Sequence, residues 1–461
     1  MKVTFYCLLR VPILPLVLAL TAIASAAPPA EAKPNPQIAG VVKKISAQKI
    51  EASIHKLVSF GTRHTLSDAT SETRGIGAAR RWLQSEFERY GKDSGGRLQV
   101  TMDEFTQPPG ERNPQPVQVV NVVATLPGEQ AEARDRIYVA SGHYDSRVSD
   151  PMNATADAPG ANDDASGVAA VLELARVMSQ QKWDATLVFM AVAGEEQGLF
   201  GSTHWAKMAK EKHWNVAGMI TNDIIGSSHA DDGHLDNTHV RLFAEGVPPL
   251  QEMPDAWRKQ IQTGGENDSA ARELARFIKT TGERYVPEMT VNIIYRKDRY
   301  LRGGDHSPFL EAGFAAVRLT EPNESFNHQH QDVRKENGLQ YGDLPEFDDF
   351  AYIAQVARIN AASLGALALA PAAPAGVEME TKELTNDTTL HWQANREPDL
   401  AGYEVLWRET TSPLWQQTAA AGNVKRFTVP KVSKDNFLFG VAAVDQDGNR
   451  SPAVYPAPSA K

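Results

Sequence analysis

Histidines and carboxylates, the side chains that most often hold metal ions, recur in this chain next to short apolar runs. His143 and Asp145 follow the run 137–141 and are separated by a single residue. Similar groups occur at four more places: Asp163 just before the run 167–178, Glu195 and Glu196 after 186–193, Asp223 after 216–222, and His328 and His330 after 315–319. Any one of these groups alone is more often a surface feature than a site. The ordered set of five indicates a metal centre.

The apolar runs predict the elements that position these residues. Five runs are short and rich in Val, Ile and Ala, as buried strands are: 117–126, 137–141, 186–193, 216–222 and 315–319. Helical spacing occurs in 45–58, 75–90 and 167–178. This alternation predicts an α/β fold with a mostly parallel central sheet flanked by helices. Ligands bind at the carboxyl ends of such strands, so we expect the five groups to meet at one edge.

In this order the five groups resemble the co-catalytic di-zinc exopeptidases of the aminopeptidase Y and bacterial leucyl aminopeptidase type. Glutamate carboxypeptidase is a more distant relative. The resemblance covers about residues 45–369 and implies five metal ligands, a general base and a residue that supports a ligand. The first zinc ion would be bound by His143 and Asp223, the second by Glu196 and His328, and both by Asp163. Glu195 would be the catalytic base, and Asp145 would hold the second ring nitrogen of His143.

The chemistry of these side chains agrees with that assignment. Two histidines and three carboxylates suit two Zn²⁺ ions per chain, with Co²⁺ or Mn²⁺ as substitutes. Paired ions about 3.5–4 Å apart acidify a water between them. A carboxylate beside that water can take its proton and pass it to the leaving amine. Relatives often have a cis peptide bond after the bridging aspartate, here Asp163-Asp164.

Two histidines compete for the last ligand position. His328 precedes Asp332 by four residues, which is the spacing in the family, so we assign His328 as the ligand. His330, in the same stretch, is the alternative. His306 follows Gly303-Gly304-Asp305 and matches another family motif, in which the histidine is not a ligand. We expect His306 to be structural or near the substrate.

The composition and net charge limit the classes of molecule that the protein is expected to bind. The length of 461 residues predicts two or three domains, and the content of 42% hydrophobic and 23% charged residues is that of an ordinary globular protein. Its formal net charge is −10 and it has no basic cluster, which argues against a nucleic-acid partner. Peptides are the expected substrate.

Residues 1–26 have the pattern of a signal peptide. Lys2 and Arg10 form a basic region, and the apolar run 11–22 is too short to span a bilayer comfortably. Small residues at Ala24 and Ala26 offer a cleavage site. No later run approaches membrane length. We therefore expect a soluble, secreted or periplasmic product without membrane contact after cleavage.

The pattern changes after the Ala- and Pro-rich stretch 370–376. Short alternating strands follow, and Trp392, the Gly-Tyr-Glu-Val sequence of 402–405 and Ala443-Val444-Asp445 resemble a fibronectin type III module. We expect a small all-β sandwich, and modules of this kind can attach to a surface, a polymer or the catalytic domain. The predicted domains are a signal peptide (1–26), a linker (27–38), a di-zinc peptidase domain (39–369), a second linker (370–376) and the sandwich (377–461).

The most direct interpretation is an exported di-zinc aminopeptidase. A carboxypeptidase, a dipeptidase or a glutaminyl cyclase on the same scaffold are alternatives. Cyclase relatives typically keep one zinc site, and a carboxypeptidase needs basic residues that face the substrate carboxylate. Arg147, Arg299 and Arg302 are candidates for that role. A third interpretation is a binding protein whose α/β domain is vestigial, which would purify without metal.

Overall fold

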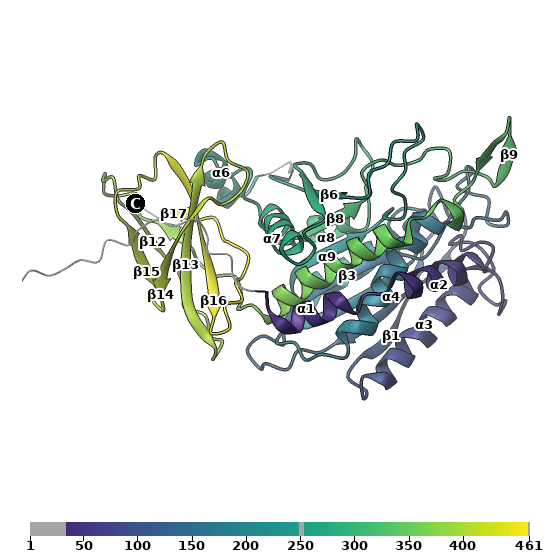
Figure 1. The fold of residues 1–461 in the computed structure, drawn as a ribbon, viewed down its shortest axis with the longest axis horizontal. Helices are drawn as coiled ribbons and strands as arrows, with labels where there is room; N and C mark the ends of the chain where they lie inside the picture. Colours follow the sequence, from purple (N-terminus) through teal and green to yellow (C-terminus); the bar gives the residue numbers. More distant parts are fainter. Residues whose placement is uncertain (1–33, 249–252, 460–461) are drawn as a thin grey trace, which may run out of the picture.

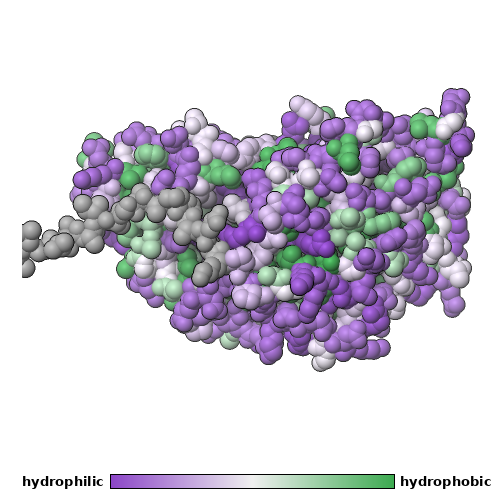
Figure 2. All heavy atoms as spheres, in the orientation of Figure 1, coloured by the Kyte–Doolittle hydropathy of each residue, from purple (hydrophilic) through white to green (hydrophobic). Residues whose placement is uncertain are grey.

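The computed structural model describes residues 34–248 and 253–459, which form an α/β body followed by two smaller β-sheets (Figure 1). The predicted signal peptide, residues 1–26, lies outside the described residues. Among the described helices, none has the length and apolar character needed to cross a membrane. Figure 2 shows a mostly hydrophilic face on which hydrophobic residues lie in small groups.

A mixed, mostly parallel sheet of eight strands forms the centre of the body. Its strands are β1 (Gln99–Gln107), β2 (Val117–Leu126), β3 (Arg136–His143), β4 (Thr186–Val192), β5 (Asn215–Asn222), β6 (His239–Ala244), β7 (Thr290–Ile294) and β8 (Ala316–Thr320). Their order is β1-β2-β4-β3-β5-β8-β6-β7. The four central strands β4, β3, β5 and β8 run parallel. The expected fold class is confirmed.

Helices cover both faces of this sheet. One face carries α1 (Pro36–Lys43), α2 (Ala47–Val58), α3 (Gly75–Asp93), α4 (Gly167–Met178), α7 (Ala270–Tyr285) and α9 (Phe350–Leu369), and the other carries α5 (Phe200–Glu211) and α8 (His306–Ala312). Successive residues of a strand point to opposite faces. In β4, Leu187 and Phe189 therefore enter the larger core, whereas Val188 and Met190 pack against Trp205 of α5.

The apolar runs do not predict every element of the body. Strand β6 lies in the polar segment 230–288, outside the predicted runs, and pairs with both β7 and β8. This strand has only six residues between polar loops, so its apolar signal is diluted in the surrounding sequence. Helix α1 begins at Pro36, inside the range predicted as a linker, and the Asn35 side chain caps it by accepting from the N–H of Gln37.

The remaining short elements lie around the body. They are the π-helical turn η1 (Ala161–Ser166), the short helix η2 (Pro345–Phe347), the hairpin of β9 (Arg334–Glu336) and β10 (Leu339–Tyr341), and α6 (Asp255–Gln262). Turn η1 leads directly into α4 and carries Asp163. Helix α6 packs beside β17, at the edge of the C-terminal sheets.

The C-terminal module, residues 377–459, contains two small sheets. Its strands are β11 (Glu378–Met379), β12 (Thr388–His391), β13 (Leu400–Glu409), β14 (Gln417–Gly422), β15 (Arg426–Val429), β16 (Phe437–Asp445) and β17 (Ala457–Pro458). The sheet orders are β15-β12-β11-β17 and β14-β13-β16. A separate apolar cluster includes Trp392, Tyr403, Trp407 and Phe439. The predicted all-β C-terminal part is therefore present.

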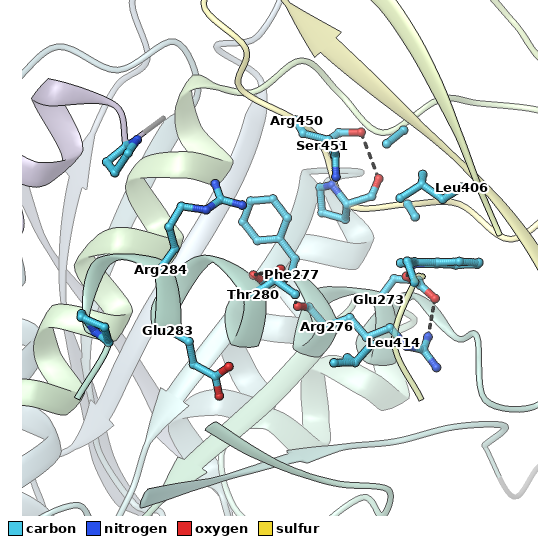
Figure 3. A pocket seen from close by; sticks show the side chains of 16 residues that line it. Glu273, Arg276, Phe277, Thr280, Glu283, Arg284, Leu406, Leu414, Arg450 and Ser451 are labelled. Carbon is cyan, nitrogen blue, oxygen red and sulfur yellow. Dashed lines mark hydrogen bonds and ion pairs between the residues drawn. The ribbon is translucent and has the colours of Figure 1, made fainter. Parts of the chain in front are cut away.

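Buried charges join this module to the body. Arg408 of β13 donates to both carboxylate oxygens of Asp268, and Arg276 of α7 donates to one of them at 3.0 Å. Trp415 donates its indole N–H to Glu273 of α7 at 3.0 Å. A groove of about 730 Å³ lies beside this junction, between α7 and the module (Figure 3). These contacts hold the module against the body.

Candidate metal centre

The five groups of polar residues meet at the carboxyl edge of the central strands. His143 is the last residue of β3, and Asp223 directly follows β5. Glu195 and Glu196 follow β4, and Asp163 lies in the turn that precedes α4. Parallel strands bring their carboxyl ends to one edge, so residues far apart in sequence become neighbours there.

The first cluster is formed by His143, Glu195 and Asp223, whose ligand atoms lie within 4.8 Å of one another. Nε2 of His143 is 3.8 Å from Oδ1 of Asp223 and 3.1 Å from Oδ1 of Asp163. His143 and Asp223 are buried. Asp163 thus reaches this cluster with one of its two carboxylate oxygens.

The second cluster is formed by Asp163, Glu196 and His330. Nε2 of His330 is 2.9 Å from Oδ2 of Asp163 and 2.9 Å from Oε1 of Glu196. The oxygen of Asp163 that faces His330 is therefore not the one that faces His143. A carboxylate that presents one oxygen to each of two clusters has the arrangement needed to bridge two ions.

The structure places His330 in this cluster and not His328, which was the expected ligand. Its ring stacks on Phe347, with the ring centroids 3.7 Å apart. His330 has a left-handed backbone with φ of 56°, and this turn directs its ring toward Asp163. Between them, Gln329 donates its side-chain amide to Oδ2 of Asp163 at 3.1 Å. The spacing to Asp332 pointed to His328 because spacing alone does not reveal the turn that brings His330 to Asp163.

Asp145 supports the site differently from the expectation. Nδ1 of His143 is 3.2 Å from the backbone carbonyl oxygen of Asp145, whereas the Asp145 carboxylate is 3.7 Å away. That carboxylate accepts the backbone N–H groups of Glu195 and Glu196 at 3.2 and 3.1 Å. It also accepts the hydroxyl of Thr65 at 2.9 Å. Asp145 thus fixes the backbone of the two glutamates, and Thr65 is a partner that no sequence motif indicated.

Asp164 connects the elements that carry the clusters. The peptide bond between Asp163 and Asp164 is cis, as the resemblance implied. The Asp164 carboxylate accepts the N–H groups of His143, Gly167 and Ile224 at 2.9, 3.0 and 3.3 Å. These three residues belong to the end of β3, the start of α4 and the loop after β5. One buried side chain therefore fixes three segments around the centre.

The environment shifts the pKa values of the clustered groups. Burial raises the pKa of Glu195 well above its ordinary value, although nearby His143 opposes the shift. Burial also disfavours charge on Asp163, but His330 and His143 outweigh it and lower the pKa of Asp163 well below its ordinary value. Burial opposes protonation of His330, yet Glu196 and Asp163 raise its pKa to about 10. The same site therefore shifts two carboxylates in opposite directions: burial favours the protonated form of Glu195, whereas the two histidines favour the ionised form of Asp163.

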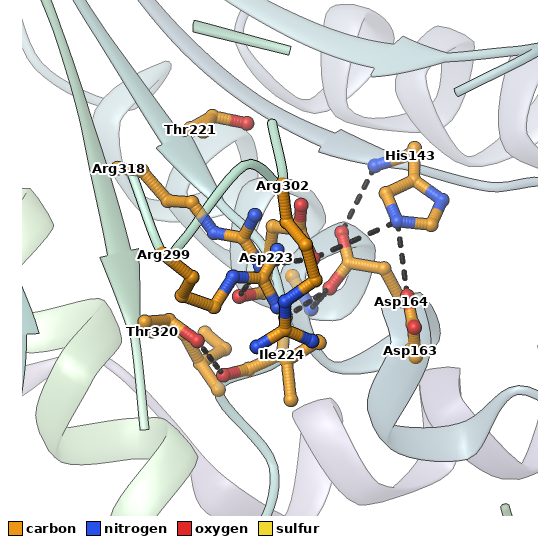
Figure 4. A network of polar contacts seen from close by, with 12 residues as sticks. His143, Asp163, Asp164, Thr221, Asp223, Ile224, Arg299, Arg302, Arg318 and Thr320 are labelled. Atoms are coloured by element: carbon orange, nitrogen blue, oxygen red, sulfur yellow. Dashed lines mark hydrogen bonds and ion pairs between the residues drawn. The ribbon is translucent and has the colours of Figure 1, made fainter. Parts of the chain in front are cut away.

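An arginine network lies behind Asp223 (Figure 4). The buried Arg318 places Nη2 3.0 Å from Oδ1 of Asp223. Its Nη1 donates to the carbonyl oxygen of Gly303 at 3.0 Å. Arg299 and Arg302 point to the same region, and both pair with Glu324, at 2.9 and 3.3 Å.

The loop that precedes α8 packs closely on this network. A side chain on Gly304 would collide with Arg318 and crowd Asp223, with atoms at 2.9 and 3.2 Å from its first carbon. His306 is fully buried, and its Nε2 lies 2.8 Å from the carbonyl oxygen of Lys297. His306 therefore belongs to the packing behind the centre.

The donor set fits two divalent ions. Each cluster brings a histidine and a carboxylate of its own, and Asp163 contributes one oxygen to each. Oε1 of Glu196 is buried and, within the described residues, has no hydrogen-bond donor other than the imidazole of His330. Imidazole and carboxylate donors that leave positions open are typical of catalytic zinc.

Comparison with known proteins identifies relatives along most of the chain. The sequence model of Peptidase family M28 matches residues 121–349. A protein of Leptosphaeria maculans named "Probable zinc metalloprotease" is 52% identical over 425 residues, which cover 92% of this chain and 98% of that protein. A protein of Pyricularia oryzae with the same name is 49% identical over 430 residues, covering 92% and 85%.

Solved structures share the fold. The aminopeptidase LapA of Legionella pneumophila superposes with a TM-score of 0.51 at 20% sequence identity. The superposition covers 71% of this chain and 74% of LapA. At 20% sequence identity, this similarity shows that the two proteins share the same arrangement of strands and helices.

Proposed function

Because the chain belongs to peptidase family M28 and is a zinc metalloprotease, we propose that it is an exported aminopeptidase that uses two zinc ions. One ion would be held by His143, Asp223 and one oxygen of Asp163. The other would be held by Glu196, His330 and the second oxygen of Asp163. The observation that carries this proposal is the division of the Asp163 carboxylate, whose two oxygens lie 3.1 and 2.9 Å from two different histidines.

The protein groups around these positions account for the proton transfers of peptide hydrolysis. The ions, when bound, acidify a water and polarise the scissile carbonyl. Glu195 lies with the first cluster, and burial raises its pKa, so it can accept a proton and then release it. Asp145 accepts the backbone N–H of Glu195 and thereby holds its position. Glu195 would move the proton from the water to the leaving amine.

The charge at the centre supports cleavage at the amino end of a peptide. Besides the carboxylates assigned to the ions and to the base, the buried Asp305 adds a further carboxyl group near Glu195, and such an acidic centre favours a substrate end that carries a positive charge. A carboxypeptidase would instead need a free cation. Arg147 pairs with Glu196, and Arg299 and Arg302 both pair with Glu324, so these three guanidinium groups already have anionic partners. This favours an aminopeptidase over a carboxypeptidase.

Two further alternatives fit the site less well. Both clusters contain their full donor sets, whereas cyclases that resemble this family typically keep one zinc site. A vestigial domain in a binding protein would have no reason to retain two such sets.

We also propose that residues 1–26 direct export and that the C-terminal module is of the fibronectin type III kind. The second point is supported by its two sheets around Trp392 and Tyr403.

Hydrolysis of aminoacyl-nitroanilides tests this function, with N-acetylated and C-terminally free peptides measured in parallel. We expect cleavage of the unblocked substrates only, and loss of that cleavage with a chelator. Glu195→Gln should lower kcat by about 10²–10⁴-fold while the zinc content is retained. Cleavage of blocked peptides that have a free carboxylate would instead support a carboxypeptidase, and wild-type rates in Glu195→Gln would exclude Glu195 as the base.

A further inference from the structure

The two oxygens of the Glu196 carboxylate have different partners. Oε1 faces the second cluster and lies 2.9 Å from Nε2 of His330. Oε2 lies 2.8 Å from Nε of Arg147, which donates a hydrogen bond to it. The guanidinium of Arg147 therefore occupies one side of this carboxylate and leaves the other side to the cluster.

Arg147 is built into this position from several directions. It follows His143 and Asp145 in the segment after β3, and its side chain is 16% exposed. Nη1 donates to the carbonyl oxygen of Val148 at 3.2 Å. Nη2 lies 2.6 Å from Nδ1 of His330. In all, Arg147 touches the two residues that belong to the second cluster alone.

The first cluster has its own arginine. Arg318 contacts Asp223 at 3.0 Å, but it is fully buried and also tied to Gly303 and Asp298 (Figure 4). Removing it would disturb the core. Arg147 lies at the rim of the site, so its removal can be tested with the fold kept intact.

We propose that Arg147 is a positioning residue that makes Glu196 a single-oxygen ligand and thereby sets the metal affinity of the second cluster. This inference rests on the proposed two-zinc function. A carboxylate can bind a metal ion through one or both oxygens. By holding Oε2, Arg147 keeps Glu196 from taking a second coordination position, and a catalytic zinc ion needs that position open for water or substrate.

The contact of Arg147 with His330 contributes less to this role than its contact with Glu196. A histidine that gives the lone pair of Nε2 to a metal ion carries its proton on Nδ1. Nδ1 then cannot accept from a guanidinium, so Arg147 and His330 must separate slightly on metal binding. The pair with Glu196 has no such conflict, because a carboxylate accepts through both oxygens.

Zinc titration of the metal-free protein against a competing chromogenic chelator tests this role. We expect Arg147→Gln to weaken the binding of one zinc ion by about 10- to 100-fold and to leave the other unchanged, as loss of a residue that orients a ligand commonly does. Arg147→Lys should restore part of the affinity. Arg112→Gln is the matched control, because Arg112 donates to the backbone carbonyl of Glu196 at 2.8 Å and not to its carboxylate.

The outcomes separate this proposal from the function on which it rests. Two wild-type affinities in Arg147→Gln, or an equal loss at both sites, would overturn the role of Arg147 and leave the aminopeptidase proposal standing. A wild-type protein that binds fewer than two zinc ions would overturn both. Thermal unfolding of each variant in chelator serves as the folding control, and all should match the wild-type protein.

Discussion

Arg408 of the C-terminal module donates hydrogen bonds to both carboxylate oxygens of Asp268 in the α/β body, at 2.7 and 3.0 Å. The side chains are only 2% and 0% exposed. Two buried charges of opposite sign stabilise each other, but either one alone is strongly destabilising because water cannot reach it. The module is therefore part of the folded body rather than a tethered appendage.

Loss of one partner of this pair should destabilise the whole protein. We expect Arg408→Met to lower the free energy of unfolding by about 3–5 kcal/mol, because among the described residues Asp268 then keeps Arg276 alone as a cationic partner. Denaturant unfolding measures this change. Lys182→Met is the control: Lys182 pairs with Glu129, and the two side chains are 74% and 40% exposed, so the loss should stay below about 1 kcal/mol. Equal effects of the two variants would contradict the structural role of the junction.

Removal of the module should have a larger effect than any single substitution. A chain that ends at residue 375 loses Arg408, Trp415 and Glu397, which pairs with the buried Arg136 at 2.9 Å. We expect this truncated protein to be recovered mainly as insoluble or unfolded material, measured by soluble yield and circular dichroism. Soluble protein with wild-type activity would instead show that the module is an accessory.

The two neighbouring histidines should respond differently to substitution. His330→Ala removes a ring that lies 2.9 Å from both Asp163 and Glu196, so we expect the loss of one zinc ion per chain and most of the activity. His328→Ala removes a ring stacked on Phe347 and should retain both ions. Elemental analysis of the purified variants gives the metal content. The reverse result would restore His328 as the ligand.

Much of the fold could be predicted because its elements have strong local signals. Strand β2 and helix α4 occupy the ranges 117–126 and 167–178 that periodicity indicated. Strand β6 was missed because its six residues lie in a long polar segment. The junction through Asp268 was also missed, since no local pattern relates a buried aspartate to an arginine 140 residues away.

The site was predictable to the level of residue type and strand end. His143, Asp163, Glu196 and Asp223 come together because parallel strands align their carboxyl ends. The choice between two histidines depends on one left-handed residue in a loop, which spacing does not encode. The supporting roles of Arg147 and Thr65 depend on tertiary contacts and have no signature in the sequence.

The proposed function requires two zinc ions, one on either side of the Asp163 carboxylate. Anomalous diffraction at the zinc absorption edge from crystals of the zinc-loaded protein tests it most directly. We expect two peaks, one among His143, Asp163 and Asp223 and the other among Asp163, Glu196 and His330. A single peak, or a second peak away from Asp163, would contradict it.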